Sequence, residues 1–109
     1  MTVQEIPEFA KEADRLLGEV VHDQLITFLG LNPTAGVIVP ATGGVRKLRW
    51  AVPGRGKRGG ARVIYYFLDD AAPLLALDIY AKNVRGDLTE EQKKQLRMVA
   101  AAYAKRHRR

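Results

Sequence analysis

The residues best able to do chemistry in this chain are seven cations within residues 43–68. They are Arg46, Lys47, Arg49, Arg55, Lys57, Arg58 and Arg62, and this stretch contains no acidic residue. Lysine and arginine bind phosphate oxygens, and fixed cations stabilise the charge that develops there during phosphodiester cleavage. In RNA the substrate's own 2′-hydroxyl can be the nucleophile, and a lysine whose pKa is lowered by neighbouring cations can accept its proton. The stretch therefore predicts a nucleic-acid site with RNA cleavage as its candidate reaction.

A glycine-rich segment lies in the middle of these cations. Residues 52–60 read VPGRGKRGG, and their glycines let the backbone approach a ligand closely. The segment is not a nucleotide-binding phosphate loop, because neither Ser nor Thr follows the lysine and the glycine spacing differs. Trp50, Tyr65 and Tyr66 lie close by in sequence and could stack on bases, although the favoured alternative is that Trp50 and one of the two tyrosines are core residues.

The segment after the glycines is expected to be a strand, because residues 61–68 (ARVIYYFL) are β-branched and aromatic. Alternation places Arg62 and Tyr66 on the same face. An unpaired arginine is costly to bury within an apolar strand, so Arg62 should either meet an acid or point into a cleft. Among so many cations, we favour a cleft in which Arg62 holds a phosphate.

Other catalytic sets are missing from the sequence. The chain has no serine and no cysteine, which excludes serine and cysteine nucleophiles, disulfides and thiolate metal sites. His22 and His107 are far apart in sequence and are expected to be surface residues. Asp69 and Asp70 fit a turn better than a metal site.

The charge distribution supports the same interpretation. The net charge is +6, and residues 1–42 balance at −4, residues 43–68 at +7 and residues 69–109 at +3. A localised positive zone attracts phosphate backbones, although a merely solubilising surface is the alternative. Without a signal-peptide-like N-terminus or a long apolar segment, we expect a cytoplasmic protein with one domain, residues 1–109, ending in a basic tail at 104–109.

The hydrophobic pattern predicts an α+β fold. Helical spacing runs from Phe9 to about Leu31, with Gly18 as a candidate break, and a short strand at residues 3–6 could precede it. Extended segments follow at residues 37–39, 46–50, 61–68 and 74–80. Thr89 and Gln92 match a capping box that opens a last helix, which should fade into the basic tail. We expect two N-terminal helices packed on a small antiparallel meander sheet, with a C-terminal helix.

Several of these segments strongly resemble the HigB-like branch of the RelE/HigB toxin superfamily. The resemblance rests on residues 43–50 (GGVRKLRW), 56–67 (GKRGGARVIYYF), 80–83 (YAKN) and 87–89 (DLT), and it covers about residues 28–100. It implies the toxin of a type II toxin–antitoxin system with a RelE-like fold. Its implied activity is ribosome-dependent, metal-independent cutting of mRNA in the A site, without a cofactor. The implied partners are mRNA, the ribosome and a cognate helix-turn-helix antitoxin, through which alone the toxin meets operator DNA.

The resemblance implies that the basic residues of the cleft are Arg55, Lys57, Arg58 and Arg62, with Lys82 after the last strand. We expect Lys57, Arg58, Arg62 and Lys82 to be catalytic, and we expect the RNA-binding residues to be Arg46, Lys47, Arg49, Arg55, Tyr66 and Tyr80. The chain departs from some relatives, which carry an arginine just after the last strand and a stacking tyrosine near the C-terminus. Asn83 lies near the first position here, and Tyr66 or Tyr80 would have to stack instead. Two alternatives remain, a ParE-like toxin that inhibits DNA gyrase and a non-catalytic RNA- or ribosome-binding module.

Overall fold

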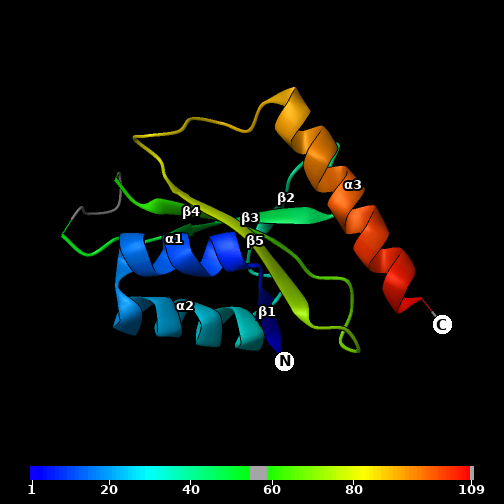
Figure 1. Cartoon of the computed structure of the whole chain (residues 1–109), viewed down its shortest axis with the longest axis horizontal. Coiled ribbons are helices and arrows are strands. Elements are labelled where there is room, and N and C mark those ends of the chain that lie inside the picture. The colour runs from blue at the N-terminus through cyan, green and yellow to red at the C-terminus, as the bar shows by residue number, and fades with distance from the viewer. Residues whose placement is uncertain (55–58, 109) are drawn as a thin grey trace.

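The computed structural model describes residues 1–54 and 59–108, and its helices and strands follow the predicted order (Figure 1). The elements are β1 (Val3–Glu5), α1 (Pro7–Leu17), α2 (Glu19–Leu31), β2 (Val37–Ile38), β3 (Val45–Trp50), β4 (Ala61–Tyr66), β5 (Leu74–Ala81) and α3 (Glu90–His107). The α+β prediction is confirmed, including the short first strand.

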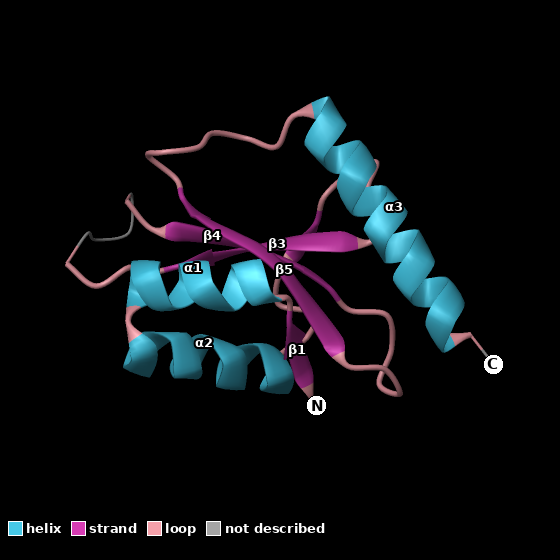
Figure 2. Cartoon of the chain, in the orientation of Figure 1, coloured by secondary structure: helices cyan, strands magenta, loops and turns pink. Residues whose placement is uncertain are grey.

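The strands, drawn in magenta in Figure 2, form one sheet, and their order in it is β1-β5-β4-β3-β2. The predicted antiparallel meander is confirmed for β3, β4 and β5. β1 adds to it as a parallel edge strand beside β5, so the sheet as a whole is mixed rather than purely antiparallel. The pairing of β4 with β5 shifts between Ile64 and Tyr65, which leaves Leu77 without a partner residue on β4.

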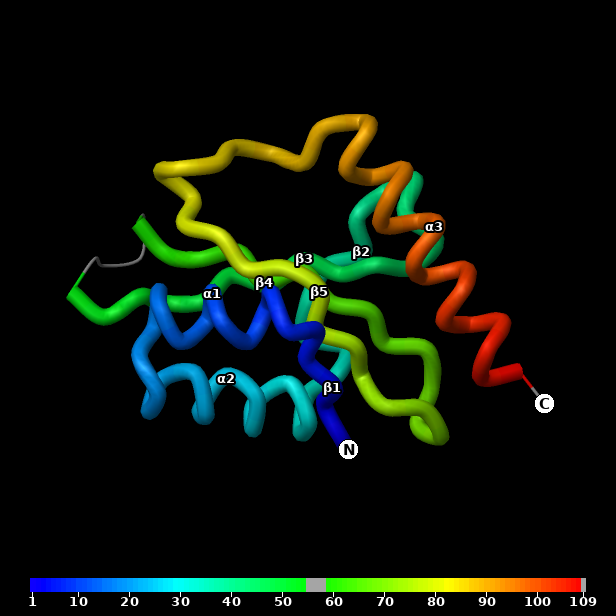
Figure 3. Tube along the Cα trace, viewed as in Figure 1, coloured from blue at the N-terminus to red at the C-terminus, as the bar shows by residue number. Residues whose placement is uncertain are grey.

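The α1–α2 hairpin covers one face of the sheet (Figure 3). Gly18 separates the two helices with a φ of 79°, a left-handed conformation that glycine adopts without a steric penalty. Phe9, Leu25 and Leu29 of the helices pack against Val63 and Tyr65 of β4. This cluster is the main core of the protein.

α3 covers part of the opposite face. Ala100 and Tyr103 pack on Val45, Tyr66 and Leu75, at the end of the sheet where β4 finishes and β5 begins. The predicted capping box at the start of this helix is present. The helix runs to His107, further into the basic tail than we expected from the sequence, so the cations of its last turn are held on a regular helix.

The prediction that His22 is a surface residue is wrong. We expected a surface residue, but only 7% of His22 is exposed, because the ring lies between β1, α1 and α2. Its Nδ1 donates to Asp14 and its Nε2 to Glu5. Across residues 1–54 and 59–108, no helix combines the length and apolar character that crossing a membrane requires.

Candidate nucleic-acid interface

Strands β3 and β4 place three of the predicted cations on one face of the sheet. Arg49 lies directly opposite Arg62, and Lys47 lies opposite Ile64 two residues further along β3. Because strand residues alternate between faces, all of these side chains share the face on which α3 packs. α3 covers the other end of this face, around Val45 and Tyr66.

Arg62 is the most buried cation of this group. Only 7% of it is exposed, and its guanidinium donates one hydrogen bond, to the carbonyl of Ala61 at 3.3 Å. Within the described part of the chain, Arg62, Arg49 and Lys47 form no ion pair with an acid. A buried charge without a counter-charge is costly, which makes this place on the sheet receptive to an anion.

Tyr80 and Lys82 border Arg62 on the side of β5. Tyr80 lies directly opposite Arg62 and is 6% exposed. Burial raises the pKa of the Tyr80 phenol, so that its hydroxyl stays protonated and can donate a hydrogen bond. Lys82 is anchored beside the glycine-rich segment, because its backbone N–H donates to the carbonyl of Gly60 at 3.0 Å. Its ammonium lies 3.8 Å from the carboxylate of Asp87, which is a weak, exposed ion pair.

Arg85 is a further cation at this site that the sequence did not indicate. Its guanidinium lies over the ring of Tyr80, 4.1 Å from the centroid, and donates to Asp78 at 2.8 Å. Because Arg85 occupies one face of the Tyr80 ring, a base could stack there only after Arg85 moves. Arg85 comes from the irregular connection between β5 and α3, where no periodic pattern points to a position in space.

Tyr66 lies at the far end of the same face. It is four residues from Arg62 along β4, a span of about 13 Å at the usual rise of a strand. Its ring packs edge-on against Tyr103 of α3, with centroids 6.1 Å apart, and only 6% of the residue is exposed. The structure therefore separates the two tyrosines named as candidate stacking residues, with Tyr80 beside Arg62 and Tyr66 beside α3.

Arg46 lies on the opposite face of β3 from Lys47 and Arg49. Its guanidinium donates hydrogen bonds to the carbonyls of Gly36 at 2.8 Å and Thr34 at 3.3 Å. These bonds hold the segment that follows α2 against the sheet. Trp50 and Tyr65 also face the helices, where Trp50 packs on Phe28 with ring centroids 5.2 Å apart. Tyr65 belongs to the core, and Trp50 is partly buried against it.

Three candidate residues of the glycine-rich segment, Arg55, Lys57 and Arg58, lie outside the described residues. The strands on either side fix where the segment begins and ends. Trp50 pairs with Ala61 at the last rung between β3 and β4, so residues 51–60 connect the two strands next to Arg49 and Arg62.

A family model and a solved structure are both similar to this chain. The model of a family described as the RelE toxin of the RelE/RelB toxin–antitoxin system matches residues 34–109. Among solved structures, the chain is similar to a mutant of the E. coli toxin RelE in the free state. The two share 15% sequence identity, the alignment covers 98% of this chain and 97% of the other, and the TM-score is 0.56. This likeness shows a common fold.

Proposed function

The chain belongs to the RelE family of toxins from toxin–antitoxin systems, and we propose that it inhibits translation by cutting mRNA on the ribosome. The reaction is endonucleolytic and needs no metal ion or cofactor. Because ribosome-bound mRNA is the substrate, the protein acts in the cytoplasm. Its resting state is a complex with a cognate antitoxin, which we expect to be a helix-turn-helix protein that links the toxin to operator DNA.

The observation that carries this proposal is the direct opposition of Arg49 and Arg62 on the sheet. Like charges that face each other across a strand pair destabilise a sheet, so their proximity is a cost to folding. An RNA phosphate between or above them offsets that cost by neutralising both. Lys47 on the same face and Lys82 beside Gly60 extend the same positive surface.

The cleavage step follows from the residue types available. The 2′-oxygen of the substrate attacks the adjacent phosphorus, and the bond from phosphorus to the 5′-oxygen of the next nucleotide breaks. Arg62 and Arg58 stabilise the charge on the phosphoryl oxygens. Lys57 or Lys82 accepts the proton of the 2′-hydroxyl, and a second protonated group donates to the leaving oxygen. Tyr80 supplies a protonated hydroxyl beside Arg62.

Inducible expression tests the function. Growth arrest together with primer-extension stops inside the translated codons of a reporter mRNA is the expected result. The stops should disappear when translation is blocked, because the substrate is mRNA on the ribosome. Cuts that persist in untranslated RNA would contradict the ribosome dependence.

The same experiment separates the two alternatives. A gyrase-inhibiting toxin would arrest growth without cutting the reporter and would change the supercoiling of a plasmid. A basic binding module without catalysis would leave both the reporter and the plasmid intact.

A further inference from the structure

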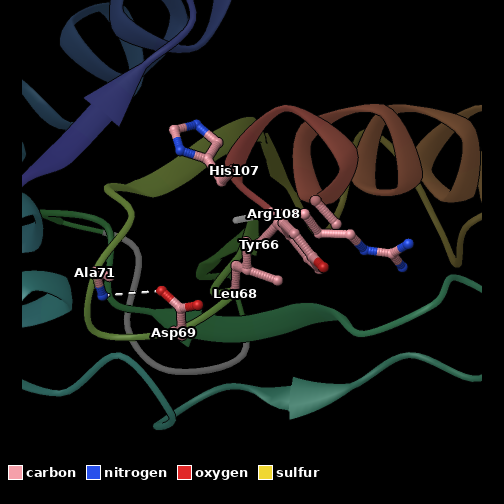
Figure 4. A pocket seen from close by; sticks show the side chains of 7 residues that line it. Tyr66, Leu68, Asp69, Ala71, His107 and Arg108 are labelled. Atoms are coloured by element: carbon pink, nitrogen blue, oxygen red, sulfur yellow. Dashed lines mark hydrogen bonds between the residues drawn. The ribbon is translucent and has the colours of Figure 1, made fainter.

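A pocket of about 460 Å³ lies between the last turn of α3 and the turn that joins β4 to β5. Its lining residues are Tyr66, Leu68, Asp69, Ala71, Ala104, His107 and Arg108. A smaller hollow of about 140 Å³ shares four of these residues and adds Ala72 and Arg106. Figure 4 shows His107 and Arg108 from the end of the helix, with Asp69 and Ala71 of the turn on the other side. The larger pocket has the size of a small-molecule site.

The aromatic side of the pocket is held in place by α3. The His107 ring lies 4.4 Å from the ring of Tyr103, which in turn packs edge-on against Tyr66. Tyr103 is fixed because its hydroxyl donates to the carbonyl of Pro73 at 2.6 Å. His107 is half-buried, so its ring is both positioned and accessible. A positioned planar ring at a pocket wall is suited to stacking on a nucleobase.

The polar side of the pocket offers a hydrogen-bond acceptor for a base and cations for a phosphate. Oδ1 of Asp69 accepts hydrogen bonds from the backbone N–H groups of Ala71 at 2.8 Å and Ala72 at 3.1 Å. The carboxylate is thereby fixed at the rim, where it can accept a hydrogen bond from the amino group of a base. Arg106 and Arg108 at the end of α3 are exposed cations that can bind a phosphate.

The pocket opens on the same sheet face as the candidate cleavage site. Tyr66 of the pocket wall and Arg62 share one face of β4 at a separation of about 13 Å, the rise of four strand residues. Ile64 lies between them on this face and is fully buried, so an RNA strand that reaches both places must pass along the edge of α3. The sequence did not indicate the pocket, because His107 and Asp69 are 38 positions apart and only the docking of α3 brings them together.

We propose that this pocket binds one unpaired nucleotide of the RNA that is cut at Arg62, two or more nucleotides from the cleaved bond. The base stacks on His107 and its amino group bonds to Asp69, while its phosphate contacts Arg106 and Arg108. This inference rests on the proposed function. A nucleotide fits this combination of groups, because Leu68 and Ala104 offer apolar surface to a base while His107, Asp69 and the two arginines supply stacking, hydrogen bonding and positive charge.

The test is an abasic scan by fluorescence anisotropy on the full chain. The probe is a labelled oligoribonucleotide of about six nucleotides, with 2′-O-methyl groups that remove the nucleophile. Removing the base at one position should weaken binding to the wild type about tenfold, the usual effect of losing one stacked base. In His107→Ala, removing the base at that position should no longer weaken binding, because the ring on which the base stacks is gone. Arg108→Ala should weaken binding of the intact probe.

Lys105→Ala is the matched control for Arg108→Ala. Lys105 is an exposed cation of the same helical turn that lines neither hollow, so its loss should leave binding nearly unchanged. The pocket assignment would be overturned if removing a base at any position left binding to the wild type unchanged. It would also be overturned if Arg108→Ala and Lys105→Ala weakened binding equally. If the wild type still cuts mRNA on ribosomes in that case, the proposed function stands without the pocket. An intact abasic effect without mRNA cutting would instead contradict the proposed function.

Discussion

Arg49 and Arg62 face each other directly across strands β3 and β4, and neither is paired with an acid within the described part of the chain. Directly opposed side chains in an antiparallel pair have Cβ atoms about 5 Å apart, so the two guanidinium groups repel each other. The pair therefore opposes folding in the absence of ligand and favours the binding of an anion.

The first prediction concerns Arg49. Arg49→Gln should leave the free energy of unfolding unchanged or raise it by up to about 1 kcal/mol, because it removes a like-charge pair. The same substitution should weaken RNA binding, and the slope of log K against log salt should fall by about 0.7, the loss of one phosphate contact. Urea unfolding and RNA titrations at several salt concentrations measure the two effects.

The control for Arg49→Gln is Lys11→Gln, which removes a charge from the exposed surface of α1. It should change neither the unfolding free energy nor the salt slope. A clear loss of stability in Arg49→Gln would mean that the arginine supports the fold. It would contradict the claim that repulsion between Arg49 and Arg62 destabilises the sheet.

The second prediction concerns Tyr65. Its side chain is fully buried, its hydroxyl accepts from the N–H of Gly36 at 2.8 Å, and it donates to the carbonyl of Pro33 at 2.9 Å. Tyr65→Phe leaves both backbone groups without this partner, and we expect unfolding to become easier by about 1–3 kcal/mol. Thermal or urea unfolding measures the change.

Tyr80→Phe is the matched control for stability, because the hydroxyl of Tyr80 has no hydrogen-bond partner among the described residues. It should destabilise the fold much less than Tyr65→Phe. Equal effects of the two substitutions would show that the hydroxyl of Tyr65 does not hold the segment after α2.

The third prediction is a pH dependence that depends on His22. Burial alone would lower the pKa of His22, but hydrogen bonds to Asp14 and Glu5 outweigh it and raise the pKa above the ordinary value near 6.5. The native state then holds its proton more tightly than the unfolded state. The stabilisation is complete below about pH 6.5 and is lost as the pH rises through the native pKa.

Unfolding free energies measured in steps from pH 5.5 to 9 should reveal this fall. His22→Gln should remove it, while His107→Gln, the matched change at the other histidine, should retain it. A wild-type stability that is flat or rising above about pH 6.5 would show that the ring is not held as an imidazolium.

The fourth prediction concerns Ala41, which has a φ of 67° in the turn before β3. An alanine in this left-handed region carries a steric penalty that glycine avoids. Ala41→Gly should stabilise the protein by up to about 1 kcal/mol, the penalty less the larger chain entropy of glycine. The control Ala51→Gly lacks the positive φ and should be destabilising or neutral in the same denaturation measurement.

Local patterns were sufficient to predict most of the fold. The β-branched and aromatic run of β4, the helical spacing on both sides of Gly18 and the capping box at Thr89 each depend on neighbouring residues. Alternation along β4 also placed Arg62 and Tyr66 on one face correctly. The parallel addition of β1 beside β5 could not be derived, because three residues carry too little pattern to fix a pairing partner.

The site was harder to predict because it depends on distant contacts. From the sequence, Arg46 and Lys47 were both predicted to bind RNA. In the structure they lie on opposite faces of β3, and Arg46 donates hydrogen bonds to backbone carbonyls after α2. His22 was expected at the surface, but Asp14 and Glu5 hold its ring in a buried position. Arg85 was missed because only the return of the β5–α3 connection puts it over Tyr80.

The most direct test of the account compares mRNA cutting by the wild type, Arg62→Ala and Arg97→Ala on translating ribosomes. Arg97 is an exposed arginine of α3 bonded to the carbonyl of Ala41, remote from Arg62, and its loss should leave cutting intact. Arg62→Ala should lower cutting about 100-fold or more while far-UV circular dichroism still reports a folded protein. Full cutting by a folded Arg62→Ala protein would contradict the claim that this buried arginine stabilises the reacting phosphate.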